Sequence, residues 1–255
     1  MEIANFVCMK WKDAYSADYV NKLYNMIQRN IKRPFRLICY TENREGIIPE
    51  VEVYDLPPFN FPEEWLWRAY RKKSLTRSVL HPFKEGERFL FLDLDVVITG
   101  SLDEMFDYET DKDFIICYNW TRGKGKIGNS SVTMMRVGAL NHVIEDLEND
   151  PVKYVNQYKT ASQEYMSAKI IEKYGQLTFW PDEWCRSFQI HCMQWRFMRL
   201  VKAPSLPPVG CKVLIFHGAV NPPDAVNGHW PGKVPFYKKF YKTIKPTPWI
   251  NNFWK

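Results

Sequence analysis

Short apolar runs alternate with segments of helical periodicity along the first half of the chain. Residues 5–10 and 35–40 are apolar runs of strand length, and residues 51–54 form a shorter third run. Between the first two, apolar side chains recur at helical spacing over residues 17–30, behind Ser16 as a helix cap. The repeated order of strand, helix and strand predicts an α/β domain with a mixed, mainly parallel central sheet flanked by helices.

The same patterns continue through the rest of the chain. After a proline-rich loop they predict a helix over residues 64–80 and a strand over 89–98. The remaining predicted elements are strands at 114–118, 131–135 and 212–216 and helices at 137–147 and 162–173. A basic loop with three glycines, residues 122–128, joins the first two of these strands. It is interpreted either as a solvated hairpin loop or as a contact for phosphate or acceptor.

Two carboxylates, Asp93 and Asp95, interrupt the apolar run at 89–98 on either side of Leu94. Side chains at positions i and i+2 of a strand share one face, so we expect their oxygens to lie together at the carboxyl end of the strand. Two like charges in a site of low dielectric constant require compensation, and a divalent cation is the simplest form of it. Mg2+ takes one or two protein carboxylates and completes its octahedron with water and substrate phosphates. The pair therefore predicts a metal and diphosphate site.

The composition is typical of a folded protein in a reducing compartment. With 255 residues, of which 45% are hydrophobic, the chain is long enough to bury the core of one domain. Its six cysteines show no CxxC spacing and lie partly in apolar runs, which favours reduced core thiols over disulfides or zinc ligands. The N-terminal residues lack the pattern of a signal peptide, and no long apolar run suggests a membrane span. We therefore expect a cytoplasmic protein.

Positive charge is concentrated near the C-terminus. The net charge is +6, and residues 230–255 carry six lysines among eight aromatic residues. This mixture suits the headgroup region of an anionic membrane, although the aromatic side chains can equally pack on the preceding domain. We divide the chain accordingly into a domain at 1–229 and a C-terminal segment at 230–255, packed on the domain or in peripheral contact with a membrane. No nucleic-acid partner is expected, because no recognised motif accompanies this moderate charge.

The segment Phe-Leu-Asp-Leu-Asp-Val-Val-Ile-Thr-Gly-Ser-Leu, residues 91–102, resembles the metal-binding DxD segment of GT-A glycosyltransferases and is most similar to family 8. The similarity continues in order through most of the chain. It implies a GT-A, Rossmann-like fold and the transfer of a hexose from a nucleotide diphosphate sugar, expected to be UDP-linked, with retention of configuration. The implied cofactor is Mn2+ or Mg2+. The implied acceptor is a hydroxyl of a glycan, a lipid-linked saccharide or a protein.

The resemblance also implies a set of donor-binding residues. Asp13 and Tyr15 follow the first predicted strand, where family members place an acidic residue and an aromatic ring that stacks on uracil. Lys72 stands in the place of a basic residue near the donor diphosphate, although three extra residues separate it from the DxD segment. Asn129 begins a segment similar to the family's Asn-Ala-Gly-Val, whose asparagine lies near the donor sugar. The implied donor site is completed by Asp93, Leu94 and Asp95.

A second set of residues is implied for the reaction itself. Residues 162–164, Ser-Gln-Glu, resemble the family's Asp-Gln-Asp segment, whose glutamine lies beside the reacting anomeric carbon. Gln163 is therefore expected to stabilise an oxocarbenium-like transition state through its amide oxygen. Glu164 is the nearest candidate for a covalent nucleophile. Ser162 replaces the first carboxylate of the family segment, which weakens an acid or base role at that position.

A late histidine resembles a third metal ligand of the family. His217 and Gly218 end an apolar run, and the resemblance implies that His217 completes a metal site with Asp93 and Asp95. The neutral imidazole would face the ion while its other nitrogen is hydrogen-bonded. Asn221 stands where the family has a phosphate-binding lysine.

Two other functions remain open from the sequence. Asp-Leu-Asp after an apolar strand also opens the motif of haloacid-dehalogenase phosphatases, in which the first aspartate is the nucleophile. Here two or three strands precede the motif and a well-placed later acidic pair is missing, which counts against that class. A non-catalytic nucleotide-sugar-binding module is the third interpretation, and Ser162 and Asn221 are the substitutions that favour it.

Overall fold

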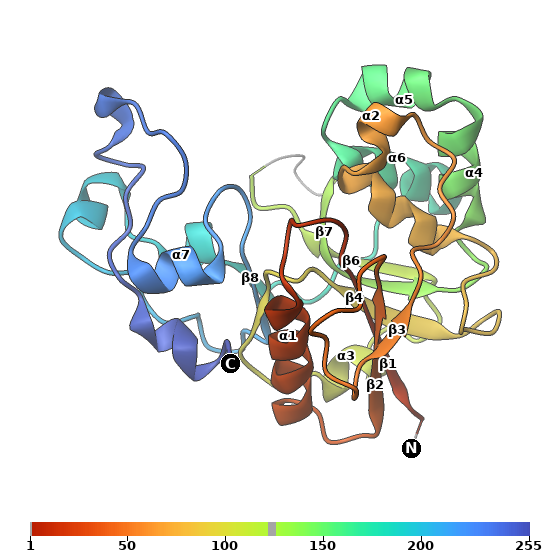
Figure 1. Cartoon of the computed structure of the whole chain (residues 1–255), viewed down its shortest axis with the longest axis horizontal. Coiled ribbons are helices and arrows are strands. Elements are labelled where there is room, and N and C mark those ends of the chain that lie inside the picture. The colour runs from red at the N-terminus through yellow and green to blue at the C-terminus, as the bar shows by residue number, and fades with distance from the viewer. Residues whose placement is uncertain (1, 122–125) are drawn as a thin grey trace. The chain divides into compact units, whose positions relative to one another are not determined.

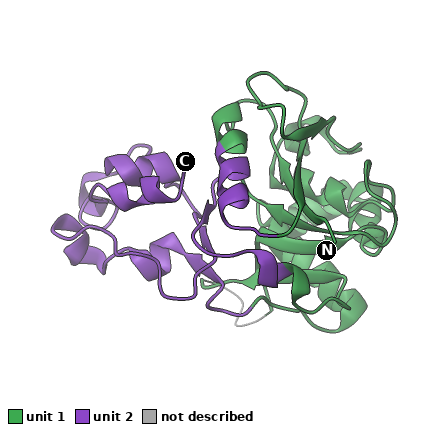
Figure 2. Cartoon of the chain, turned by 90° about the horizontal axis from the view of Figure 1, so that it is seen from below, with its two compact units in different colours: residues 1–21, 33–94, 106–180 green, residues 22–32, 95–105, 181–255 purple. Residues whose placement is uncertain are grey.

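The computed structural model describes residues 2–121 and 126–255, and its backbone is shown in Figure 1. The chain divides into two compact units, coloured green and purple in Figure 2. Unit 1 consists of Met1–Asn21, Arg33–Leu94 and Phe106–Trp180, and unit 2 of Lys22–Lys32, Asp95–Met105 and Pro181–Lys255. The division of the chain between residues 229 and 230 stays a prediction. Four of the seven residues of the predicted basic loop at 122–128 lie outside the described residues.

In the described part of the chain, the centre of unit 1 is a six-stranded sheet with the order β3-β2-β1-β4-β7-β6. Its strands are β1 (Ala4–Met9), β2 (Phe35–Tyr40), β3 (Glu52–Tyr54), β4 (Arg88–Leu92), β6 (Phe114–Tyr118) and β7 (Gly128–Arg136). The pairs among β1, β2, β3 and β4 are parallel, whereas β7 is antiparallel to both of its neighbours, β4 and β6. The predicted mixed, mainly parallel sheet flanked by helices is confirmed.

The burial of strand β1 explains why strands of this sheet could be predicted from runs of apolar residues in the sequence. It lies between β2 and β4, and all six of its residues are buried. A parallel strand covered on both faces is apolar at nearly every position rather than at every second one. The ring of Phe6 lies 6.1 Å from that of Phe35 in β2 and 5.1 Å from that of Phe106, so one side chain contacts the neighbouring strand and a segment outside the sheet.

Three helices of unit 1 pack on one another (Figure 1): α4 (Asn141–Asn149), α5 (Pro151–Tyr158) and α6 (Ser162–Tyr174). The fully buried ring of Tyr165 lies 4.9 Å from the ring of Tyr154 and 5.6 Å from that of Tyr158. Its hydroxyl donates a hydrogen bond to the carbonyl oxygen of Val143 at 2.7 Å. Burial raises the pKa of Tyr165 far above its usual value, so the hydroxyl stays a donor at every physiological pH. Of these three helices, α5 was not predicted.

The prediction of one helix over residues 64–80 is wrong. These residues form α2 (Glu63–Leu66) and the 3-10 helix η1 (Ala69–Thr76), and Arg68 between them has an extended backbone. Six of the eight residues of η1 are buried, so burial is not confined to one face. A surface α-helix requires an apolar stripe on one face and a polar face opposite it, and this segment has neither.

Two other predicted boundaries are wrong. Strand β4 ends at Leu92, and a turn leads to β5 (Val97–Ile98), which belongs to the sheet of unit 2. Asp93 and Asp95 therefore do not share the face of one strand. Helix α4 begins at Asn141 rather than at residue 137, because Gly138 has a φ of 88° and the left-handed region cannot continue a right-handed helix.

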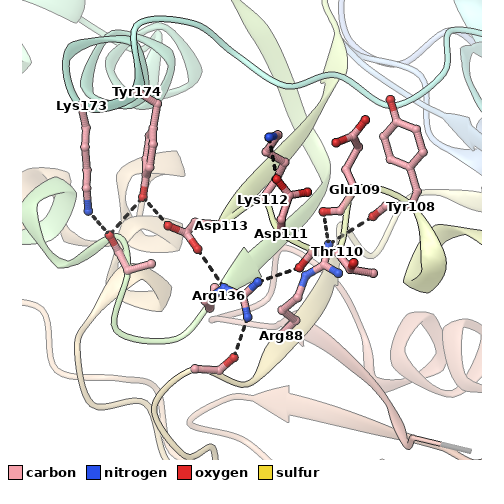
Figure 3. Close-up of polar contacts among 12 residues, drawn as sticks. Arg88, Tyr108, Glu109, Thr110, Asp111, Lys112, Asp113, Arg136, Lys173 and Tyr174 are labelled. Atoms are coloured by element: carbon pink, nitrogen blue, oxygen red, sulfur yellow. Dashed lines mark hydrogen bonds and ion pairs between the residues drawn. The ribbon is translucent and has the colours of Figure 1, made fainter.

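Polar contacts close the edge of the unit 1 sheet at which β4 begins and β7 ends (Figure 3). Nε of Arg136 donates to Oδ1 of Asp113 at 2.8 Å, and the hydroxyl of Tyr174, at the end of α6, donates to Oδ2 at 2.9 Å. A second guanidinium nitrogen of Arg136 donates to the carbonyl oxygen of Thr110 at 2.8 Å. Because these groups satisfy one another, this edge is structural and joins α6 to the sheet.

In the described residues, unit 2 contains a three-stranded sheet with the order β5-β9-β8, completed by β8 (Cys185–Ser187) and β9 (Val213–Ile215). The helix α7 (Pro222–Asn227), which lies wholly in unit 2, begins where the N–H of Asn221 donates to Asp224 at 3.0 Å. It ends at Gly228, whose φ is 68°. Short helical turns make up much of the remainder: η2 (Phe188–Cys192), η3 (Arg196–Leu200), η4 (Phe236–Lys238) and η5 (Pro248–Asn252).

Two helices contain residues of both units, namely α1 (Ala17–Arg29) and α3 (Asp103–Asp107). The boundaries of α1 agree with the predicted helix at 17–30 to within one residue. Among the residues described, no helix combines the length and the apolar character required to cross a bilayer.

Candidate functional site

Four of the predicted site residues lie at one edge of the unit 1 sheet. Asp13 and Tyr15 follow β1, and Asp93 follows β4, the parallel neighbour of β1. Because β7 is antiparallel to β4, it begins where β4 ends, and Asn129 is its second residue. In open α/β sheets ligands bind outside the carboxyl ends of the parallel strands, which is this edge.

Asp93 forms an ion pair with Lys72, which belongs to η1. The side chains of Lys72 and Asp93 are 19% and 18% exposed, so both are shielded and still accessible to a ligand. The backbone N–H of Asp93 donates to the carbonyl oxygen of Ser131 at 2.9 Å, which continues the pairing of β4 with β7 by one residue. The structure thus brings together two residues that were predicted for the donor site from separate segments.

Sequence reasoning missed Lys73, the neighbour of Lys72. Its side chain is only 2% exposed, and burial, together with the positive charge of Lys72, lowers its pKa to about 7. Lys73 and Ser130 line a cavity of about 10 Å3, which is room for about one water molecule. Thr133 also lines this cavity, and its buried hydroxyl has no hydrogen-bond partner in the described structure. The run Arg-Lys-Lys was the signal in the sequence, but nothing in it shows which lysine is buried.

Hydrogen bonds connect Gly128, the neighbour of Asn129, to Gln163. The backbone N–H of Gly128 donates to Oγ of Ser167 at 3.0 Å, and Ser167 donates in turn to the carbonyl oxygen of Gln163 at 2.8 Å. Asn129 is 8% exposed, and its side-chain oxygen accepts from the N–H of Ser131 at 3.0 Å. The first turn of α6 is therefore attached to the first residues of β7.

A glycine is required at the start of this link. A Cβ at residue 128 would lie 2.5 Å from Cδ1 of Ile116, which is closer than any ordinary contact between carbon atoms. Any larger residue would push β7 away from β6 and would move the N–H that holds Ser167.

The loop after β1 has an aromatic and basic environment. Tyr15 is half-buried, and its ring lies 4.8 Å from the ring of Tyr19, whereas Asp13 is exposed. Nζ of Lys12 lies 4.7 Å from the ring centre of Trp67, and the guanidinium of Arg71 lies 5.8 Å from the same ring. Cations over an indole ring gain about 0.5–2 kcal/mol each, so Trp67 helps to hold this loop beside η1.

Two further predicted residues lie where their side chains face the interior of unit 1. Leu94 is 2% exposed as a whole residue and therefore offers a donor almost no surface. Glu164 lies in the first turn of α6 and is half-buried. Burial raises the pKa of Tyr70 to about 12, and Tyr158 and the negative charge of Glu164 contribute to the same increase. The carboxylate of Glu164 therefore lies near Tyr70 and Tyr158.

Asp95 and His217 belong to unit 2. His217 follows β9, its Nε2 lies 2.6 Å from Oγ of Ser187, and its carbonyl oxygen accepts from Gln189 at 2.7 Å. Burial, and to a smaller degree the nearby His191, lowers the pKa of His217 below its usual value. The imidazole is therefore neutral at pH 7.

The chemistry of Asp93, Asp95 and His217 fits Mn2+ or Mg2+. Two carboxylates supply hard oxygen ligands, and a neutral imidazole supplies a nitrogen lone pair. Within residues 2–121 and 126–255, no group of three or more His, Cys, Asp or Glu side chains has a geometry that could hold a metal ion. The three-ligand set stays a prediction.

No protein-family model and no curated protein matches the chain. Among solved structures, a complex of the galactosyltransferase LgtC with donor and acceptor sugar analogues matches with a TM-score of 0.57 and 14% identity, over 86% of this chain and 88% of LgtC. An active-site mutant of LgtC, in which a glutamine is replaced by glutamate, matches with a TM-score of 0.57 and 15% identity, over 86% and 89%.

The bifunctional glycosyltransferase WbbM matches with a TM-score of 0.58 and 15% identity, over 98% of this chain and 51% of WbbM. At these identities the likeness is one of fold. The predicted GT-A fold is confirmed.

Proposed function

We propose that this protein is a metal-dependent glycosyltransferase that moves a hexose from a nucleotide diphosphate sugar, UDP-linked by preference, to an acceptor hydroxyl with retention of configuration. The observation that carries the proposal is the ion pair of Lys72 and Asp93 at the carboxyl edge of β4, within a GT-A fold. A lysine beside a partly exposed carboxylate provides a cation for a diphosphate and an anion for the metal that accompanies it. The complex of LgtC with donor and acceptor analogues supports the same class of reaction.

Asp93, Asp95 and His217 are the residues that would hold Mn2+ or Mg2+. When bound, the ion supplies Lewis-acid stabilisation of the negative charge that grows on the leaving diphosphate. Lys72 adds a second positive charge. His217 is suited to its role because it is already neutral, so no proton has to leave before it binds.

Asn129 and Gln163 are proposed to surround the donor sugar. The hydrogen bonds that run from Gly128, the neighbour of Asn129, through Ser167 to Gln163 fix the first turn of α6 relative to β7. The amide oxygen of Gln163 then stabilises positive charge at the anomeric carbon without acting as a base. The LgtC mutant in which a glutamine is replaced by glutamate shows that a glutamine belongs to the active site of that enzyme, which supports this role.

Retention is proposed to occur by departure and attack on one face of the sugar. Glu164 is half-buried near Tyr70 and Tyr158 and is the carboxylate to test as a covalent nucleophile. On the front-face route, the bond from the anomeric carbon to the phosphate oxygen breaks, the acceptor oxygen bonds to that carbon, and the phosphate takes the acceptor proton. Tyr15 would stack on the base, and the exposed Asp13 would contact the nucleoside.

The test is donor hydrolysis across UDP-, GDP- and CDP-sugars with Mn2+, with p-nitrophenyl phosphate as a phosphatase substrate. The variant Asp95→Ala is compared with Glu50→Ala, which removes an exposed carboxylate elsewhere in the chain. We expect Mn2+-dependent release of UDP from one sugar, lost in Asp95→Ala and kept in Glu50→Ala.

Two outcomes would contradict the proposal. Phosphate release from p-nitrophenyl phosphate, with every nucleotide sugar intact, would assign the phosphatase class. Binding of UDP with no hydrolysis and no transfer from any sugar would assign the non-catalytic module.

A further inference from the structure

The C-terminal part of unit 2 is almost without negative charge. From Ser187 to Lys255 the chain carries ten lysines and arginines and one acidic residue, Asp224. That single carboxylate accepts the N–H of Asn221 at the start of α7. Of the ten cations, Lys212 forms an ion pair with Glu104. The net charge of residues 187–255 is therefore more positive than that of the whole chain, which is +6. Such a region attracts an anionic partner.

Large aromatic side chains are exposed in the same region. Phe236 is 89% exposed, Trp195 69%, Tyr237 66% and Phe197 54%. Single exposed apolar residues are common, but four exposed aromatic residues within residues 195–197 and 236–237 are a concentration of the kind that marks an interaction site.

The two segments that carry these residues, 195–202 and 236–241, are in contact. The rings of Phe197 and Phe240 are stacked, with centres 5.3 Å apart, and the ring of Trp195 lies 5.4 Å from that of Phe197. A guanidinium nitrogen of Arg199 donates to the carbonyl oxygen of Tyr241 at 2.9 Å. Residues 195–202 and 236–241 are therefore joined, and we call them the aromatic basic surface.

Cations and apolar side chains alternate over this surface. Arg196, Arg199 and Lys202 are interspersed with apolar residues in the first segment, and Lys238 and Lys239 follow two aromatic residues in the second. No ion pair of these five residues occurs in the described part of the chain. Their charges are therefore available to an anionic partner.

The exposed aliphatic side chains of this surface indicate the kind of partner it binds. Val201 is 71% exposed and Leu200 47%. Aromatic rings stack on nucleobases and sugars, but aliphatic side chains gain little from such partners and much from the hydrocarbon boundary of a bilayer. Aromatic residues prefer the interface between headgroups and acyl chains, and lysines near it are attracted by anionic lipids.

We propose that the aromatic basic surface binds the interfacial region of membranes that contain anionic lipids. The lysines and arginines contact the headgroups, and Trp195, Phe236 and Val201 enter the boundary with the acyl chains. The binding site includes residues 195–202, which lie outside the C-terminal segment at 230–255. The proposal does not depend on glycosyl transfer, although a lipid-linked acceptor would be found at the same surface.

The experiment is co-sedimentation of the full chain with vesicles of phosphatidylcholine alone and with vesicles containing 30% phosphatidylglycerol. We expect at least about tenfold tighter binding to the anionic vesicles, because each cation near such a surface strengthens binding about fivefold. Raising the ionic strength should weaken the binding, since the Debye length falls from about 10 Å at 0.1 M to about 3 Å at 1 M.

Two double variants separate the contributions, and both are checked for folding by circular dichroism. Lys238→Gln with Lys239→Gln should reduce binding to anionic vesicles at least about tenfold. Trp195→Ser with Val201→Ser tests the first segment and should reduce binding by a similar factor. The matched control, Val79→Ser with Lys153→Gln, alters an exposed valine and a lysine in unit 1 and should leave binding unchanged.

The proposal fails if the wild-type chain binds neither kind of vesicle. It also fails if heparin captures the chain and the anionic vesicles do not, which would assign the surface to a polyanion. Equal loss of binding in the control and in the two double variants would overturn the assignment to this surface. Donor hydrolysis, measured on the same variants without vesicles, should not change, so this result is independent of the proposed function.

Discussion

Two pairs of adjacent lysines occupy short 3-10 turns in the two units, and their surroundings differ completely. In η1, Lys73 is 2% exposed, and Lys72 pairs with Asp93. At the end of η4, Lys238 and Lys239 follow the exposed rings of Phe236 and Tyr237. The same dipeptide thus places one lysine against a single carboxylate in η1, whereas at the end of η4 it adds two positive charges to an exposed surface. Partners and burial, rather than residue type, therefore decide what a basic pair does.

The largest effect that tests this difference is expected from Asp93→Asn. The variant keeps the shape of the side chain but removes the charge that pairs with Lys72, and we expect turnover of the nucleotide sugar to fall by about 10^3-fold. Release of UDP at saturating Mn2+ measures it. Binding to anionic vesicles should remain at the wild-type level. Turnover within threefold of the wild type would show that the ion pair of Lys72 and Asp93 has no function in the reaction.

The next effect is expected from Gln163→Ala, which removes the proposed stabilising oxygen and leaves the link from Gly128 to Ser167 in place. We expect kcat to fall by about 10^2-fold, while the KM for the donor changes little, because the interaction develops in the transition state. The control is Gln157→Ala on the exposed side of α5. A rise in KM with kcat unchanged would mean that Gln163 only binds the donor.

The burial of Lys73 should appear as a pH dependence of stability. Its pKa of about 7 lies below the unfolded value of about 10.4, so the unfolded chain binds more protons and stability rises with pH between these values. From pH 7 to pH 9 this group should add about 2 kcal/mol to the free energy of unfolding. Urea denaturation of Lys73→Met should lack this increment, whereas Lys239→Met should keep it. Identical pH profiles of Lys73→Met and the wild type would exclude a lowered pKa.

The smallest effect is expected from Phe236→Ala. This ring is 89% exposed, so the free energy of unfolding should change by less than about 0.5 kcal/mol. Phe6→Ala, in the fully buried centre of unit 1, should by contrast cost about 3–5 kcal/mol. Urea denaturation of the two variants gives the comparison. A loss above about 2 kcal/mol for Phe236→Ala would show that the ring supports the fold instead of meeting a partner.

Most strands of the unit 1 sheet could be predicted from the sequence, because β1, β2, β4, β6 and β7 are buried at most of their positions. The predicted strands at 35–40 and 114–118 agree with β2 and β6 at both ends. The break between α2 and η1 could not be predicted from the sequence. It accompanies the burial of Arg71 and Lys73, which the pattern of apolar and polar residues does not indicate. The local pattern of apolar residues indicates which residues can be buried. Which charged residues become buried depends on packing between segments that are distant in the sequence.

The candidate site was predicted in part for a similar reason. Resemblance selected Lys72 and Asp93, and the structure places them in contact. Lys73 was missed because adjacent positions of one turn point in different directions. The aromatic basic surface was missed in its first half, because the contact of Phe197 with Phe240 joins segments more than forty residues apart. Such contacts are a property of the folded chain and leave no local signature.

The link from Gly128 through Ser167 to Gln163 also bears on how this protein can change over evolution. All of its hydrogen bonds lie downstream of the connection between β6 and β7. The anchor of Gln163 therefore depends on Gly128 and Ser167. A lineage that changes either residue has to place Gln163 anew, so these two positions limit how far α6 and β7 can diverge independently.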